Sequence, residues 1–295
     1  MATLAVSKLR VVAAFIEARG SVSEAAEIAG VSKQYVYEVL GRLRSLGFRF
    51  RGFPSLGALG RVLLALSRGS TLPDGEFSVA RLRVYSFGGE EVLAGIYVLP
   101  AGARAAELLR DLSGAETVEL VDVLPAAPFH DLAELRPREG AKLLKPPHRE
   151  LDSIDKAIVA KLFEDISSPV SASVPKVSKS LLSYHYRRHV KPLLRVLLDT
   201  HPMLMHARPL LLAEVRAERE EWVAALLRAR QVYLLMPRPD SLSAYALLDV
   251  EDPYALLKKL AEARRERGIG LRMSLLGYVD PEKSEKLRIP RVFLP

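Results

Sequence analysis

The segment from Ser23 to Leu40 constrains the fold of this chain more than any other, because its apolar residues suit two short helices joined by a tight turn. Ala26 is small at the point where the helices would cross. Gly30 offers the left-handed backbone conformation that a side chain disfavours. Val36 and Val39 would face inward from the second helix, so the segment predicts a helix-turn-helix.

Polar residues at the start of the second predicted helix are left facing outward. They are Ser32, Lys33, Gln34, Tyr35 and Tyr37. Side chains at this place in a helix-turn-helix read base edges in the major groove of DNA, and glutamine can form two hydrogen bonds with adenine. Arg42 and Arg44 follow as candidate base or phosphate contacts. The alternative for each of these residues is an ordinary solvated helix surface.

Flanking residues extend this unit in both directions. The spacing of Leu9, Val12 and Phe15 predicts an earlier helix that completes a three-helix core. Residues 48–54 alternate aromatic and basic side chains, as a short strand pair or wing does, and add Arg49 and Arg51 as candidate DNA contacts. Residues 1–54 are therefore expected to form a winged helix-turn-helix domain.

Residues 55–125 have the pattern of a small α+β domain. Strand-like runs at 61–66, 81–86 and 91–99 precede a helical pattern at 102–112 and a strand at 116–124. This order resembles a ferredoxin-like βαββαβ sandwich in which an irregular loop replaces the first helix. The following residues, 126–150, are rich in proline and predict a linker.

After the linker the pattern repeats. Residues 151–163 predict an amphipathic helix, and Val177-Ser-Lys stands 146 residues after Val31-Ser-Lys. Lys176 replaces the turn glycine and His185 occupies a position expected to be apolar, so the second helix-turn-helix, over 151–200, is degenerate. A second βαββαβ pattern fills 201–284, ahead of a tail at 285–295. The chain is thus predicted to be an α+β protein with two winged helix-turn-helix domains, each followed by a ferredoxin-like domain.

Charge follows the helical segments. The net charge of +8 divides into +5 for residues 1–61, −3 for 62–150, +3 for 151–200 and +3 for 201–295. A basic surplus attracts phosphate and makes DNA binding depend on salt.

Composition narrows the class of protein. The absence of cysteine excludes disulfides and thiolate zinc sites. The absence of asparagine and the excess of arginine over lysine, 30 to 13, indicate a thermophilic source, with GC-rich coding as the alternative. No apolar run approaches the roughly 18–20 residues that span a bilayer, and no signal peptide is recognisable, so we expect a cytoplasmic protein without a membrane partner.

Basic and aromatic residues gather in the second helical segment. The candidate contacts there are Lys176, Lys179, Tyr184, Arg187, Arg188 and Lys191. They are expected to hold phosphate more than to read bases, and the alternative is a face that contacts protein or solvent. His185 and His189 have a helical spacing that lets two imidazoles share a metal, but no nearby carboxylate or thiol completes a ligand set. No metal and no cofactor are predicted.

A winged helix that opens with Leu-Asp-x-x-Asp-x-x-Ile and leads into a βαββαβ domain resembles the leucine-responsive Lrp/AsnC family of regulators. Leu151, Asp152, Asp155 and Ile158 match that opening. The resemblance implies a DNA-binding transcriptional regulator, not an enzyme, with α+β domains of the ACT/RAM type. These domains assemble the protein and can sense an amino-acid-like effector.

The resemblance also places an effector site at two hairpins. The corresponding residues are Gly88, Gly89 and Glu90 in one hairpin and Asp240, Ser241 and Ser243 in the other. For Gly88 and Gly89 the alternative is a tight turn without a ligand.

Family members usually carry one unit per chain and dimerise through their sandwich sheets. Two units in one chain imply an intramolecular pseudo-dimer with unequal reading heads, suited to an asymmetric DNA site, while a homodimer of the whole chain stays open. Two other functions also stay open. Some similar proteins are tetrapyrrole (siroheme) decarboxylases that depend on histidines and arginines around the sandwich hairpins, where this chain has Arg238 alone. An architectural protein would coat DNA without reading its sequence.

Overall fold

The computed structural model describes residues 6–69, 71–100, 103–126, 130–143, 145–174, 177–199, 210–285 and 287–295. The chain divides into two compact units, each assembled from separate stretches of sequence. Unit 1 comprises residues 1–54, 151–204 and 294–295, and unit 2 comprises residues 55–150 and 205–293. The two helical segments therefore group together, and so do the two α+β segments.

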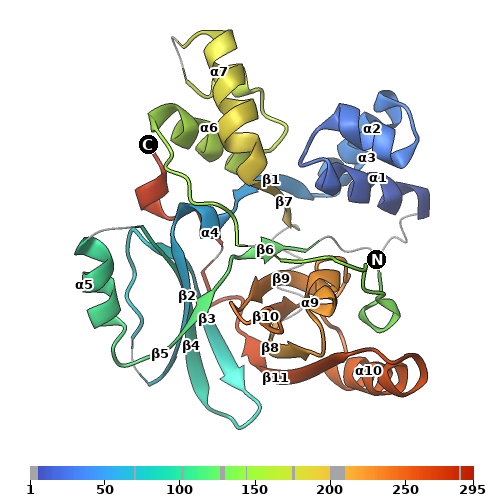
Figure 1. The fold of residues 1–295 in the computed structure, drawn as a ribbon, viewed down its shortest axis with the longest axis vertical. Helices are drawn as coiled ribbons and strands as arrows, with labels where there is room; N and C mark the ends of the chain where they lie inside the picture. The colour runs from blue at the N-terminus through green and yellow to red at the C-terminus, as the bar shows by residue number, and fades with distance from the viewer. Residues whose placement is uncertain are drawn as a thin grey trace. The chain divides into compact units, whose positions relative to one another are not determined.

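The first part of unit 1 contains three helices and a strand, α1 (Val6–Glu17), α2 (Val22–Ala29), α3 (Lys33–Ser45) and β1 (Arg49–Pro54) (Figure 1). Ser32 caps α3, because its Oγ accepts a hydrogen bond from the backbone N–H of Tyr35 at 3.1 Å. Gly30 ends α2 with a φ of +65°. Val36 and Val39 are buried. The helix pair and its glycine turn lie where the sequence pattern predicts them.

The second part of unit 1 contains α6 (Ser153–Glu164), the 3₁₀ turn η2 (Val170–Ala172), α7 (Lys179–His185), the π-helical turn η3 (Tyr186–Val190), the 3₁₀ turn η4 (Lys191–Leu193) and β7 (Leu194–Asp199). Asp152 caps α6 and forms a capping box with Asp155. Between α6 and α7, the described residues form only the short turn η2. This part is thus the more irregular of the two, in keeping with its degenerate sequence.

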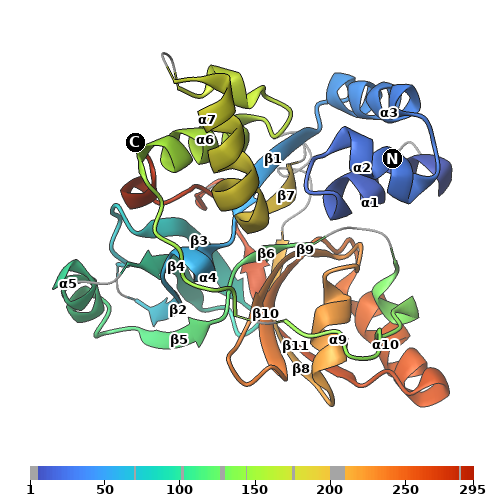
Figure 2. The ribbon, with the colours of Figure 1, turned by 45° about the horizontal axis from the view of Figure 1, so that its top comes forward.

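Strands β1 and β7 pair to form a two-stranded antiparallel sheet (Figures 1 and 2). The register runs from Arg49 opposite Asp199 to Pro54 opposite Leu194. The prediction of a strand pair within residues 48–54 is wrong, because this stretch forms one strand. Its backbone groups bond to a strand from the second helical segment instead.

The two aromatic residues of β1 pack against both parts of unit 1. Phe50 meets Phe15 of α1 edge-on, with ring centroids 5.3 Å apart. Phe53 lies 6.2 Å from Phe163 of α6. Both Phe50 and Phe53 are fully buried, so one short strand contributes to the packing of two sets of helices.

Unit 2 is built on one nine-stranded sheet in which every neighbouring pair is antiparallel. The strands are β2 (Arg61–Arg68), β3 (Ser78–Ser86), β4 (Glu91–Leu99), β5 (Glu116–Leu120), β6 (Leu124–Pro125), β8 (Leu210–Ala217), β9 (Val232–Pro237), β10 (Ser243–Leu248) and β11 (Leu271–Val279). Their spatial order is β5-β2-β4-β3-β11-β8-β10-β9-β6. Two runs of four strands, β2–β5 and β8–β11, thus have the same spatial order: the fourth strand of the run, then the first, the third and the second. Strands β3 and β11 pair with each other and so join the two runs.

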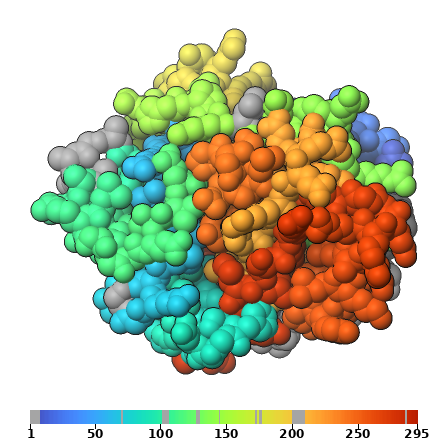
Figure 3. All heavy atoms as spheres, turned by 60° about the horizontal axis from the view of Figure 1, so that its bottom comes forward, coloured from blue at the N-terminus to red at the C-terminus, as the bar shows by residue number. Residues whose placement is uncertain are grey.

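Helices pack against each run of strands. They are α4 (Leu56–Leu59), α5 (Ala103–Asp111), α9 (Glu220–Leu226) and α10 (Pro253–Arg267). Leu108 and Leu112 pack with β2 and β4, while Trp222 and Leu256 belong to the core of the second run. Figure 3 shows one face on which the two runs, cyan to green and orange to red, meet. No helix within the described ranges has the length and apolar character needed to cross a bilayer.

The proline-rich stretch, described at 126, 130–143 and 145–150, contributes residues to a packed core. Leu132 and Leu135, beside the 3₁₀ turn η1 (Leu132–Glu134), are buried in the core that includes α9 and α10. The backbone of His130 bonds to that of Arg228 and Arg230. The described residues of the predicted linker thus have mostly irregular backbone and belong to unit 2.

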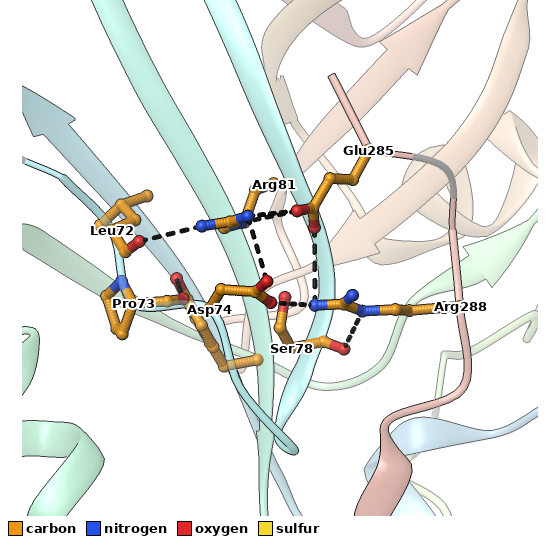
Figure 4. A network of polar contacts seen from close by, with 8 residues as sticks. Leu72, Pro73, Asp74, Ser78, Arg81, Glu285 and Arg288 are labelled. Carbon is orange, nitrogen blue, oxygen red and sulfur yellow. Dashed lines mark hydrogen bonds and ion pairs between the residues drawn. The ribbon is translucent and has the colours of Figure 1, made fainter. Parts of the chain in front are cut away.

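The C-terminal tail runs along β3. Backbone hydrogen bonds from Glu285 and Arg288 reach the carbonyls of Arg81 and Val79 at 2.8 and 2.9 Å. Figure 4 shows the side chains that accompany them: Arg81 pairs with Glu285, and Arg288 pairs with Asp74. The 3₁₀ turn η5 (Arg291–Phe293) follows, with Phe293 buried. Residues 285–293 thus belong to unit 2, whereas Leu294 and Pro295 belong to unit 1.

Candidate nucleic-acid interface

The outward face of α3 carries most of the predicted base-reading residues. Lys33, Gln34 and Arg42 are exposed, and Tyr37 presents 59% of its surface to solvent. The Nε2 of Gln34 donates a hydrogen bond to Glu38, one turn later, at 3.3 Å. This contact is exposed and easily exchanged, so Gln34 can turn toward another partner. The face therefore combines a cation, an amide and an aromatic ring.

Three other predicted contacts, on or next to this helix, are less available to DNA. Ser32 uses its hydroxyl to cap α3, and Tyr35 is only partly exposed. Arg44 donates a hydrogen bond to Ser167 and lies 3.6 Å from Asp165. The guanidinium of Arg44 is thus directed to the second part of unit 1.

The two arginines of β1 differ in their surroundings. Arg49 is exposed at the start of the strand. Arg51 forms an ion pair with Asp199 at 2.9 Å, and its guanidinium carbon lies 5.3 Å from the ring centroid of Phe163. Arg51 is therefore engaged inside unit 1 and unavailable to phosphate, whereas Arg49 is accessible.

Most of the basic residues predicted in the second segment lie on α7 and η3. Lys179, Tyr184, Arg187 and Arg188 are exposed. Lys191 instead pairs with Glu24 of α2 and has a side chain only 29% exposed. Lys176 lies outside the described residues. The exposed members form a basic surface of their own on the second part of unit 1.

His185 and His189 meet two carboxylates that the sequence argument overlooks. The Nδ1 of His185 lies 2.9 Å from Asp155 Oδ1 and 3.4 Å from Asp152 Oδ2. The Nδ1 of His189 lies 3.1 Å from Asp155 Oδ2. The premise that no carboxylate stands near this histidine pair is therefore wrong, because α6 brings Asp152 and Asp155 to it from thirty residues earlier in the chain.

The residues predicted for an effector build their own turns in unit 2. Gly89 has a φ of +83° between β3 and β4, and Glu90 forms an exposed ion pair with Arg68 at 3.3 Å. In the β9–β10 hairpin, Ser241 has a φ of +59°. The Asp240 carboxylate accepts hydrogen bonds from the Ser243 N–H and hydroxyl at 2.8 and 2.6 Å. Both hairpins are thus accounted for by local turn chemistry.

A second polar cluster lies beside the β9–β10 hairpin and was not predicted. Glu214 of β8 stands opposite Tyr245 of β10 and lies 3.7 Å from Arg238. Burial, reinforced by the nearby Glu214 carboxylate, raises the pKa of the Tyr245 hydroxyl. The sequence signal was available, because Glu214 follows four apolar residues at the start of this strand.

Comparisons with family models, with curated proteins and with solved structures found no match to this chain. The surface of α3 and the polar clusters therefore have to be interpreted from their own chemistry.

Proposed function

We propose that this chain is a transcriptional regulator of the Lrp/AsnC type that binds double-stranded DNA through α3. The proposal rests on the side chains of the outward face of that helix. Lys33, Tyr37 and Arg42 are exposed, and within the described part of the chain no hydrogen bond or ion pair occupies their side chains. With Gln34 they offer groups for phosphates, base edges and the apolar surface of a groove.

The proposed contact set is narrower than the sequence pattern alone suggests. From the first part of unit 1 it comprises Lys33, Gln34, Tyr37, Arg42 and Arg49. From the second part it comprises Lys179, Tyr184, Arg187 and Arg188, which would hold phosphate. Arg44, Arg51 and Lys191 are left out, because ion pairs within unit 1 engage them.

We further infer that the chain is an internal duplication of a winged helix-turn-helix domain and a ferredoxin-like domain. Ser178 caps α7 through the N–H of Leu181, as Ser32 caps α3 through the N–H of Tyr35, and the two serines stand 146 residues apart. The shared strand order of β2–β5 and β8–β11 supports the same inference. Under this proposal one chain supplies both halves of a pseudo-dimer, and the two hairpins stay predictions for an effector.

The experiment that tests this function is selection of genomic fragments by the purified chain at two salt concentrations. A regulator enriches a short motif, and Gln34→Ala weakens or broadens that enrichment while its folding is unchanged. Arg110→Ala, an exposed arginine on α5, serves as the control for the loss of one charge. Arg42→Ala should lower affinity on all fragments, whereas Arg110→Ala should not.

Other outcomes would support the alternatives. Salt-sensitive binding without enrichment of a motif would favour an architectural protein that coats DNA. Absence of binding, together with a coloured tetrapyrrole that copurifies, would favour a decarboxylase.

A further inference from the structure

Four side chains in the second part of unit 1 converge on one point. Asp152 and Asp155 come from the start of α6, His185 ends α7 and His189 lies in the π-helical turn η3. One potential ligand atom from each of the four lies within 4.8 Å of the other three. Neither the DNA-binding proposal nor the capping of α6 requires the two histidines, so the cluster needs an explanation of its own.

The cluster occupies positions where a helical core is normally apolar. Asp155 has a side chain 2% exposed, and that of His185 is 9% exposed. Ser178 and Ser32 are 146 residues apart, and the same offset matches His185 to Val39 and His189 to Leu43. Both of these apolar residues are buried. Buried polar groups are costly unless something compensates for their lost hydration. The second part of unit 1 thus has a polar centre where the first part has hydrocarbon.

The distances suit a small divalent ion. Zinc bonds to histidine nitrogen and carboxylate oxygen at about 2.0–2.2 Å, so neighbouring ligand atoms in a tetrahedral site lie roughly 3.3–3.5 Å apart. The corresponding contacts are 2.9 Å from His185 Nδ1 to Asp155 Oδ1, 3.1 Å from His189 Nδ1 to Asp155 Oδ2, and 3.4 Å from His185 Nδ1 to Asp152 Oδ2. Small movements of the side chains, with a rotation that brings one Asp155 oxygen toward both histidines, would give the tetrahedral spacing.

The surroundings hold the two imidazoles in place. The ring centroids of His185 and His189 are 5.0 Å apart, and Tyr184 contacts both rings edge-on at 5.7 and 5.5 Å. The π-helical turn η3 places His189, and such turns often occur at functional sites. The histidine side of the site is therefore built on regular backbone rather than on a loose loop.

We propose that Asp152, Asp155, His185 and His189 bind one divalent transition-metal ion, best represented by Zn²⁺. Two imidazoles and two carboxylates suit zinc and its neighbours better than Mg²⁺ or Ca²⁺, which take oxygen ligands alone. The two carboxylates balance the charge of the ion. The metal joins α6 to α7 and η3. It thereby stabilises a part of unit 1 in which the described residues between the two helices form only a 3₁₀ turn.

The competing account is a hydrogen-bonded cluster without metal. Asp155 could simply accept hydrogen bonds from both imidazole N–H groups, at the distances already given. The two accounts differ in whether the chain takes up metal at these four residues, which a titration decides.

The test uses the full-length, untagged chain after treatment with EDTA and dialysis. Calorimetric titration with ZnCl₂ should show one bound equivalent, and Zn²⁺ should raise the Tm. His189→Gln, at a partly exposed position, should weaken binding at least tenfold and remove the rise in Tm. His148→Gln, an exposed histidine in unit 2, is the matched control and should bind Zn²⁺ like the wild type.

A second measurement needs no variant. The Co²⁺-loaded wild type should give the visible absorption of a four-coordinate ion, and X-ray absorption of the Zn²⁺ form should count two imidazoles. Absence of binding by the wild type would overturn the proposal in favour of the hydrogen-bonded cluster. Undiminished binding by both His189→Gln and Asp155→Asn, or an all-oxygen coordination shell, would also overturn it, because the ion would then sit elsewhere.

Discussion

Single residues differ most from their predicted roles where their partners are distant in the sequence. Arg51 belongs to an aromatic and basic stretch that predicts phosphate contacts, yet it pairs with Asp199 and lies over Phe163. Asp155 lies in the first turn of α6 and completes the capping box of that helix, but its carboxylate also meets two histidines. Local sequence identifies charge and aromaticity, and it leaves contacts made across the fold undetermined.

Arg51→Ala should lower the free energy of unfolding by about 1–3 kcal/mol, because the half-buried Asp199 carboxylate would lose its cation and Phe163 its packing. Urea denaturation followed by circular dichroism measures this. Arg49→Ala, an exposed arginine on the same strand, should change stability by no more than about 0.5 kcal/mol. Equal effects of the two substitutions would contradict the structural role of Arg51.

Asp240 gives a pH-dependent contribution to stability. Burial opposes its ionisation, but hydrogen bonds from Ser243 and from the Leu242 N–H, together with the charge of Arg238, outweigh that effect and lower the pKa of Asp240 below its ordinary value. A lowered pKa in the folded state stabilises the fold above the unfolded-state value of about 3.9, and this contribution is lost as the pH falls through the lowered value. Asp240→Asn, which keeps an accepting oxygen, should therefore show a smaller loss of Tm between neutral and acid pH. An identical loss in both proteins would refute this.

At the scale of helices and strands, periodicity and turn residues predict most elements. Gly30 and the apolar spacing around it predict α2 and α3, and strand-like runs on either side of a glycine turn predict β3 and β4. The proline-rich composition of 126–150 correctly disfavours regular structure, but composition says nothing of whether Leu132 packs into a core. The pairing of strands is equally hard to predict from sequence. Strands β1 and β7 pair through backbone groups, which do not distinguish one partner strand from another.

The junction of β3 and β11 provides the test at this scale. A Cβ on Gly277 would stand 2.3 Å from the carbonyl oxygen of Tyr85, so Gly277→Ala must displace one strand from the other. We expect a loss of about 1–3 kcal/mol in unfolding free energy. Gly114→Ala is the control, because a Cβ there meets nothing within 4 Å. A harmless Gly277→Ala would show that the two runs of strands are not joined as described.

For the whole chain, the sequence pattern predicts the parts, and an expectation of how they group comes only from the family resemblance, which implies an intramolecular pseudo-dimer. The helical segments 1–54 and 151–204 form one unit, and the α+β segments form another. The proposed duplication explains this grouping, because each half finds its partner within the same chain at a high effective concentration. The two helical parts are unequal, since the described residues between α6 and α7 form only the 3₁₀ turn η2 where the first part has α2, and since the second part carries the Asp and His cluster.

A single chain should therefore occupy an asymmetric DNA site. Hydroxyl-radical footprinting, with the stoichiometry measured by light scattering, should show one chain per site, with strong base protection on one side and backbone protection on the other. Reversal of Lys179 and Arg187 charges to glutamate should remove only the backbone protection. Two equivalent half-sites protected by one chain would contradict the unequal roles of the two parts.

Sequence-specific DNA binding through α3 is tested most directly by the ratio of two affinities. One is the affinity for the motif enriched by selection, and the other is the affinity for a scrambled duplex of equal length and composition. At physiological salt we expect a ratio of roughly a thousandfold or more for the wild type, reduced by about tenfold or more in Gln34→Ala and unchanged in Arg110→Ala. A ratio near one for the wild type would contradict sequence reading by α3 and, with it, the proposed regulator.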